Sequence, residues 1–230
     1  MNSLSAILAG WIALAAIAAA DDAPVQPVAD PRPILEDLRR KMSSLRSVYL
    51  EFTQERHLNL FTEPLKSEGI MLIGRPDLIR WETTAPYQSI LLGDHKTVAQ
   101  FEHEDGAWKK LNPGFPQLLR RVMEQMVRMH EGKIDALAGD FTISVSTGSV
   151  AVVTLVPKDE TVRSMMSSLE LRMAPDFSTT REVVMREPGG DFTRIIFRRE
   201  RRDVPFPPGT FDQTKPLESA AIRSAMADGP

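Results

Sequence analysis

The segment Gly69-Ile70-Met71-Leu72-Ile73-Gly74-Arg75-Pro76-Asp77-Leu78-Ile79-Arg80-Trp81 carries the clearest structural signal in this chain. Two apolar runs flank a short stretch of glycine, proline and aspartate, which are residues that favour turns. Branched and bulky side chains dominate both runs, as is typical of β-strands. The segment therefore predicts one strand at residues 67–73 and a second at residues 78–83.

The same strand periodicity continues on both sides of this segment. Val48, Leu50 and Phe52 alternate with more polar neighbours, which predicts an earlier strand. Further strands are expected at residues 88–92, 97–103, 141–147, 150–156, 168–173, 181–187 and 192–199. Turn signals such as Asp105-Gly106 separate them. Many short strands joined by tight turns predict an antiparallel meander.

Two segments have helical periodicity instead. Apolar residues recur at positions 34, 35, 38, 42 and 45, with charged residues between them. The second segment, residues 115–138, includes Met123, Met126 and Val127 on its apolar positions. An open sheet cannot shield its own apolar face, so the helices must cover one side of it. The fold class is therefore α+β.

The two ends of the chain differ from this central part. Residues 1–20 contain no charged side chain, and Ala18 and Ala20 are small residues suited to signal peptidase. We predict a signal peptide cleaved after Ala20, with an uncleaved anchor as the alternative. Residues 21–33 hold four prolines and should form an extended linker. The folded domain is then residues 34–212, followed by a flexible tail at residues 213–230 in which residues 217–226 could form a short helix.

Composition excludes several classes of function. Lys and Arg number 28 against 31 Asp and Glu, and the resulting net charge of −3 does not suit a nucleic-acid partner. The absence of cysteine excludes disulfides and thiolate chemistry. No zinc motif, nucleophile elbow or phosphate loop occurs. We expect a protein that is not an enzyme and needs no metal or cofactor.

One acidic cluster leaves an alternative open. Glu102, His103, Glu104 and Asp105 are consecutive and include the residue types used in acid–base catalysis. A solvated strand end running into the Asp105-Gly106 turn is the simpler interpretation. A periplasmic hydrolase with a scattered site is the alternative.

Several short motifs occur in a characteristic order. They are the segment 69–81 followed by Pro86, Phe52-Thr53-Gln54, Gly93-Asp94 before Lys96-Thr97, and Phe206-Pro207-Pro208-Gly209-Thr210-Phe211. In order and spacing, this set over residues 35–212 resembles the outer-membrane lipoprotein carrier (LolA) family. The resemblance implies an incomplete antiparallel β-barrel of about ten or eleven strands, with helices covering an apolar concave face.

The resemblance also implies a function. A periplasmic carrier of this family takes acylated lipoprotein or lipid cargo from an inner-membrane exporter and passes it to an outer-membrane acceptor. The lid-closing arginine of the family falls on Arg75, and we expect the protein to be a monomer. The expected ligand-binding residues are Phe52, Met71, Ile73, Arg75, Ile79, Trp81, Met123, Met126 and Val127. A regulatory sensor domain of the same fold that binds lipid or protein is the alternative.

Overall fold

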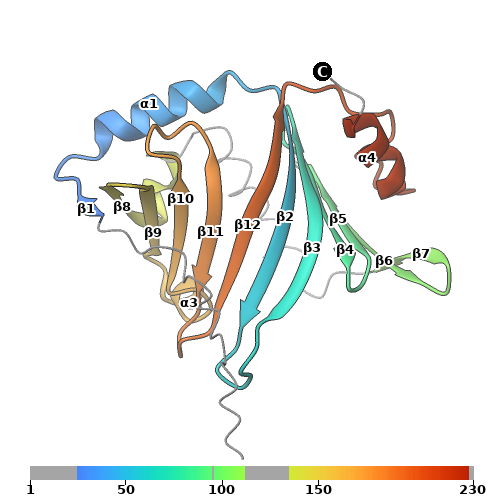
Figure 1. Ribbon diagram of the computed structural model, residues 1–230, viewed down its shortest axis with the longest axis horizontal. Helices are drawn as coiled ribbons and strands as arrows, with labels where there is room; N and C mark the ends of the chain where they lie inside the picture. The colour runs from blue at the N-terminus through green and yellow to red at the C-terminus, as the bar shows by residue number, and fades with distance from the viewer. Residues whose placement is uncertain (1–24, 95, 112–134, 228–230) are drawn as a thin grey trace, which may run out of the picture.

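The computed structural model describes residues 25–94, 96–111 and 135–227 as an open, curved sheet with short helices around it (Figure 1). The sheet has 12 strands in the order β1-β8-β9-β10-β11-β12-β2-β3-β4-β5-β6-β7. Every neighbouring pair is antiparallel. The expected α+β class and the open antiparallel sheet are therefore confirmed.

The strands follow one another across the sheet from the β1 edge to the β7 edge. They are β1 (Gln26–Pro27), β8 (Phe141–Thr147), β9 (Ala151–Pro157), β10 (Ser168–Met173), β11 (Thr180–Arg186), β12 (Phe192–Arg202), β2 (Ser47–His57), β3 (Leu65–Gly74), β4 (Leu78–Ala85), β5 (Ser89–Gly93), β6 (Val98–Glu104) and β7 (Ala107–Leu111). The described helices are α1 (Arg32–Ser43), the 3-10 helix η1 (Asp135–Gly139), α3 (Glu160–Arg163) and α4 (Ser219–Ala227). Within the described ranges, no helix has the length and apolar content needed to cross a bilayer.

Sequence alternation predicts the ten inner strands and misses both edge strands. β7 pairs with β6 on one side alone, and most of its residues are exposed. An edge strand with little buried surface does not need alternating apolar residues, and Ala107–Leu111 contains two adjacent lysines. β1 is a two-residue strand that includes a proline and pairs with β8. Part of the expected linker is thus bound to the sheet, where the Val28 amide also donates to the carbonyl of Val145 at 2.8 Å.

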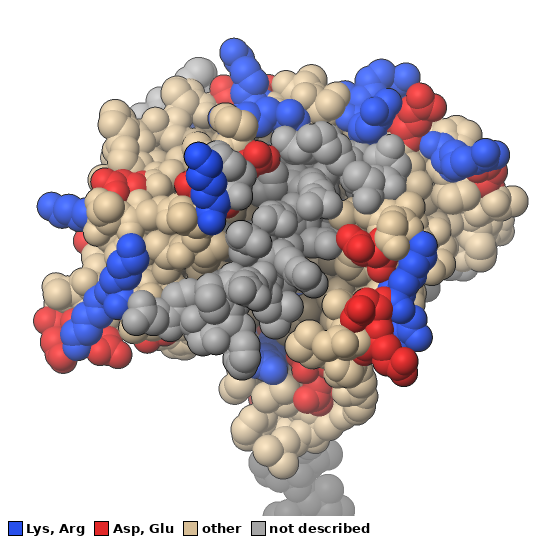
Figure 2. Space-filling view, turned by 180° about the vertical axis from the view of Figure 1, so that it is seen from behind, with Lys and Arg blue, Asp and Glu red and all other residues tan. Residues whose placement is uncertain are grey.

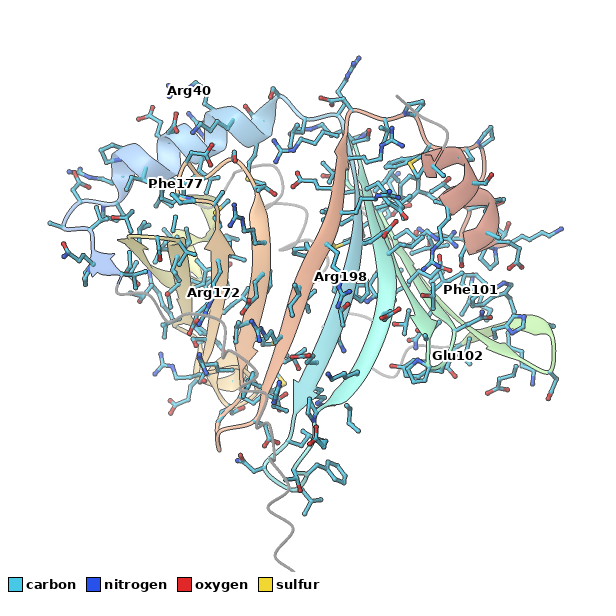
Figure 3. All side chains as sticks on the ribbon, in the orientation of Figure 1. Arg40, Phe101, Glu102, Arg172, Phe177 and Arg198 are labelled. Carbon is cyan, nitrogen blue, oxygen red and sulfur yellow. The ribbon has the colours of Figure 1, made fainter. Side chains whose placement is uncertain are left out.

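Helix α1 covers the inner face of the strands on one side of the sheet. The helix begins at Arg32, with Pro33 in its first turn, where a missing amide hydrogen costs nothing. Leu35 and Leu38 pack onto a cluster that includes Val153 of β9 and Leu171 of β10. Figure 3 shows Phe177 of this cluster beneath the helix and Arg40 on its opposite side. We call the face of the sheet that carries this cluster the inner face.

The C-terminal segment covers part of the opposite, outer face. Ile222 and Met226 of α4 are buried against Tyr49 of β2 and against Ile70 and Leu72 of β3. Figure 1 shows α4 outside the sheet, away from α1. The flexible tail expected from residue 213 is therefore a packed segment as far as Ala227, because it has an apolar surface of the sheet to bury.

The long helix expected at residues 115–138 falls mostly outside the described residues. Its last positions form η1, and Leu137 of that turn is buried in the cluster under α1. Met123, Met126 and Val127 lie outside the described residues.

Candidate functional site

Strand register brings the predicted residues of β2, β3 and β4 together on the inner face. Phe52 faces Gly69, Met71 faces Trp81, and Ile73 faces Ile79 across the ladders. Side chains at every second position of a strand share one face, and cross-strand partners point to the same side. The pattern read from the segment 69–81 therefore becomes a continuous apolar surface.

We call this surface the inner cluster. Its buried members are Leu45, Val48, Leu50, Phe52, Met71, Ile73 and Ile79. Five half-buried side chains pack against it, and these are Trp81, Leu91, Val98, Ile195 and Phe197. Phe52, Met71, Ile73, Ile79 and Trp81 were expected here. The other members were missed as site residues, although alternation in the strands that carry them could have pointed to several of them.

A close aromatic contact shapes the middle of the inner cluster. The rings of Phe52 and Trp81 lie 4.6 Å apart, centroid to centroid, at an interplanar angle of 39°. Gly69 between them permits this contact, because a Cβ at that position would lie 2.6 Å from the Phe52 ring and 1.9 Å from the backbone oxygen of Glu82. The large rings thus cover a position where the strand has no side chain of its own.

Arg75 lies at the upper end of the sheet, where β3 turns into β4. Its Nε donates to the carbonyl of Leu45 at 2.5 Å, and its Nη2 donates to the carbonyl of Met42 at 3.3 Å. Met42 belongs to the last turn of α1, whose carbonyls have no partner within the helix. A cation at this position also matches the negative end of the helix dipole. Arg75 therefore ties the end of α1 and its connection to β2 onto the edge of the inner cluster.

The outer face differs in chemistry from the inner face. On β10, β11 and β12 it carries alternating charges, with Arg186 donating to Glu170 at 2.9 Å and Arg194 donating to Glu182 at 2.9 Å. The bond to Glu182 raises the pKa of Arg194. Arg172 lies on the same face, bonded to Glu170 at 3.3 Å (Figure 3). The apolar surface is thus restricted to one side of this half of the sheet.

A buried ion pair fastens the C-terminal segment to the outer face of β4. Arg80 is fully buried and donates through Nε and Nη2 to Glu82, at 2.9 and 2.6 Å. The same guanidinium donates to the carbonyls of Thr210 and Leu217, at 3.1 and 2.6 Å. Burial raises the pKa of Glu82, and the attraction of Arg80 opposes this rise. The pair has a structural role, because it holds residues 210–217 against the sheet.

The acidic cluster lies at the end of β6 and in the turn that leads to β7. The rings of His103 and Trp108 meet edge to face at 5.1 Å. Lys109 pairs with Glu104 at 2.8 Å and with Asp105 at 3.4 Å, and the Asp105 side chain is 93% exposed. The described residues contain no group of three or more acidic or histidine side chains placed to hold a metal ion. This geometry is that of a solvated hairpin.

Comparison of the sequence with known proteins identifies the family of this chain. Residues 43–214 match the family described as "Outer membrane lipoprotein carrier protein LolA". The chain belongs to the LolA family. The match includes the strands that form the inner cluster and also Arg75.

Individual relatives of the LolA family share modest identity with the chain. It is 26% identical over 210 residues to the outer-membrane lipoprotein carrier protein of Chromobacterium violaceum, covering 86% of this chain and 88% of that protein. A 63-residue match to the corresponding protein of Proteus mirabilis is 35% identical and covers 27% of this chain and 31% of that protein.

Solved structures show weaker likeness. A LolA superfamily protein from Nitrosomonas europaea superposes with a TM-score of 0.43 at 9% identity, covering 78% of this chain and 98% of that chain. A chain of the MucA/MucB complex of Pseudomonas aeruginosa superposes on this chain with a TM-score of 0.41 at 13% identity. The superposition covers 80% of this chain and 61% of that chain.

Proposed function

We propose that this protein is a periplasmic carrier that binds the acyl chains of lipoproteins or related lipids on its inner face and moves them between membranes. The observation that carries the proposal is the half-buried apolar margin of the inner cluster, formed by Trp81, Leu91, Val98, Ile195 and Phe197. Membership of the LolA family supports it, as do the names of two relatives, both outer-membrane lipoprotein carrier proteins.

The physical need for such a carrier follows from the cost of exposing hydrocarbon to water. Each methylene taken out of water contributes about 0.8 kcal/mol, so a sixteen-carbon chain represents about 13 kcal/mol. A lipid of that kind cannot cross an aqueous space unless an apolar surface covers its chains. The inner cluster supplies apolar contacts on several adjacent strands, and no catalytic step is part of the proposal.

Release requires a cover that can open. In the proposal, Arg75 stabilises the closed position of α1 through the two carbonyls it binds, and loss of these bonds lets cargo leave. Met123, Met126 and Val127 belong to the proposed lining as apolar positions of the expected helix, and the unbranched, polarisable methionine chains adapt to varied partners. The donor is an inner-membrane exporter, the acceptor lies in the outer membrane, and the carrier acts as a monomer.

Two adjacent isoleucines of β12 provide a matched test. Ile195 packs on the inner cluster, whereas Ile196 is half-buried on the outer face, opposite Thr53. We expect Ile195→Glu to weaken binding of a fluorescent fatty acid at least about tenfold, because an unpaired carboxylate is costly among acyl chains. Ile196→Glu should leave the affinity within about twofold.

The two variants also separate the alternatives. Equal affinities of both variants and the unchanged protein would contradict binding on the inner face. Transfer of the bound fatty acid to acceptor vesicles distinguishes a carrier from a sensor, since a sensor binds lipid without passing it on. Circular dichroism checks that both variants keep their strand content.

A further inference from the structure

Exposed apolar side chains are concentrated at one end of the sheet. Among the described residues, the exposed large hydrophobic side chains are Val25, Leu60, Phe61, Leu65, Tyr87, Val156 and Met165. All except Val25 belong to connections or strand ends between β2 and β3, β4 and β5, or β9 and β10. Isolated exposed apolar residues are normal, but their concentration in one region indicates an interaction surface.

Strand register shows that these connections share one end. His57 at the end of β2 faces Phe192 of β12, and Arg186 of β11 faces both Phe192 and Ser168 of β10. Glu68 of β3 similarly faces Ala85 at the end of β4. We call this the lower end, after its position in Figure 1, where the β2–β3 hairpin extends farthest down.

Arg75 lies at the opposite, upper end. β2 spans 11 residues between the two ends, which corresponds to about 36 Å at the usual rise of a strand. The lower end is therefore spatially separate from the bonds that hold α1.

The tip of the β2–β3 hairpin presents its apolar residues on a fixed backbone. Leu60 is 85% exposed and Phe61 is 52% exposed. Next to them in the hairpin, the Asn59 backbone amide donates to Asp191 at 2.8 Å. The Asn59 side chain donates to the carbonyl of Gly189 at 2.6 Å. The β11–β12 turn thus braces the tip, so the apolar side chains are presented to the solvent without further ordering of the loop.

Charged side chains near the tip form two ion pairs, and the other charged residues there, Glu63, Glu68 and Asp191, are acidic. Arg56 lies 3.6 Å from Glu187, and Lys66 lies 3.5 Å from Glu55. Seen from behind in Figure 2, the projection at the bottom of the molecule is largely tan, which marks uncharged residues. Attraction to this end must therefore come from its apolar side chains more than from net charge.

We propose that the lower end, led by Leu60 and Phe61, is a membrane-contact surface that inserts shallowly into the interfacial layer of a lipid bilayer. A bilayer fits better than a protein groove because the β2–β3 hairpin projects farthest (Figure 1), so its apolar tip can enter a deformable surface without needing a partner of matching shape. Leu, Phe and Tyr are residue types that favour the membrane interface. Contact through a few side chains is weak and reversible, as a carrier that must leave the membrane requires.

This inference rests on the proposed function, which gives the protein a reason to touch a membrane. Its test is independent of cargo. Processed protein recovered from the periplasm is sedimented with vesicles of phosphatidylethanolamine and phosphatidylglycerol in a 3:1 ratio, and with pure phosphatidylcholine vesicles. We expect Leu60→Asp to lower the partition coefficient at least about tenfold, which matches the loss of one buried leucine.

The control variant is Val25→Asp, which makes the same apolar-to-acidic change beside β1, at the upper end. It should partition as the unchanged protein does. Binding should also persist within about twofold on neutral vesicles and in high salt, because the described residues near the tip carry no excess of positive charge that would attract anionic lipid. In a Phe61→Trp variant, brominated lipids should quench the new indole.

Besides an absence of vesicle binding, three outcomes would overturn the inference. The first is equal partitioning of the Leu60→Asp and Val25→Asp variants. The second is vesicle binding that requires anionic lipid and disappears in high salt. The third is slower cargo transfer by Leu60→Asp when no form of the protein binds vesicles. The last outcome would place a protein at the tip instead of lipid. Fatty-acid binding measured without vesicles should be unchanged in Leu60→Asp. Intact fatty-acid binding with no vesicle binding would refute the membrane contact alone and leave the carrier function standing.

Discussion

Replacing Arg75 by leucine tests whether the bonds to α1 control cargo release. Among its interactions, the variant loses the hydrogen bonds from a charged donor to the carbonyls of Leu45 and Met42. For a half-buried group these bonds together contribute about 2–4 kcal/mol. The equilibrium between open and closed positions of α1 should therefore shift by roughly 30- to 1,000-fold.

Two measurements report this shift. Hydrogen exchange should lose protection at the backbone amides of the last turn of α1 and of Leu45, while amides of β3 and β4 keep theirs. A bound fluorescent fatty acid should transfer to acceptor vesicles faster than from the unchanged protein, measured by stopped flow. Far-UV circular dichroism should not change, because Arg75 lies outside the buried clusters.

The control is Arg46→Leu, which removes an exposed positive charge from the same end of the sheet. It should leave both exchange and transfer unaltered. Arg75→Lys should fall between the unchanged protein and Arg75→Leu, because lysine keeps the charge without the forked donor geometry. If the Arg75→Leu protein exchanges and transfers at the rates of the unchanged protein, Arg75 does not hold α1 closed.

Two further predictions concern stability, both measured by urea unfolding. Gly69→Ala should destabilise the fold by about 2–3 kcal/mol or more, because its Cβ would meet the backbone oxygen of Glu82 at 1.9 Å; unfolding within 0.5 kcal/mol of the unchanged protein would contradict this. Arg80→Met should cost about 3–5 kcal/mol by leaving Glu82 buried without its partner. Burial raises the pKa of Glu82, which means that the folded state favours the protonated carboxyl. The contribution of Glu82 to the free energy of unfolding is therefore greatest at low pH and is lost as the pH rises through the folded-state pKa of Glu82. The Arg80→Met defect should therefore shrink as the pH falls, and the double variant with Glu82→Leu should recover stability at neutral pH; a pH-independent defect would count against this account.

Much of the inner face could be predicted from the sequence because a strand alternates its side chains regardless of what surrounds it. Met71 and Ile73 must share a face, and so must Ile79 and Trp81, once both segments are strands. The tight turn between them makes the strands antiparallel neighbours, which places the two pairs side by side. Local periodicity therefore sufficed for these members of the inner cluster.

Alternation gives no information about what covers the other face. It places Arg80 and Glu82 on the other face of β4 from Ile79 and Trp81. On that face, water would ordinarily surround a charged side chain. In the folded protein the C-terminal segment buries both, across about 130 residues of sequence, as the bond from Arg80 to Thr210 shows. For the same reason the sequence predicts a flexible tail at residues 213–230 and does not reveal its packing, since the partners of Ile222 and Met226 lie on β2 and β3.

The sequence by itself determined the periodicity of the strands, the turns between them and the apolar character of one side of the central strands. Tertiary structure alone decided the pairing of β12 with β2, the bonds from Arg75 to the end of α1 and the gathering of exposed apolar residues at the lower end. Periodicity depends on neighbours a few residues apart, which are visible in the chain itself. Contacts between distant segments depend on the free energy of burying them together, which no single segment encodes.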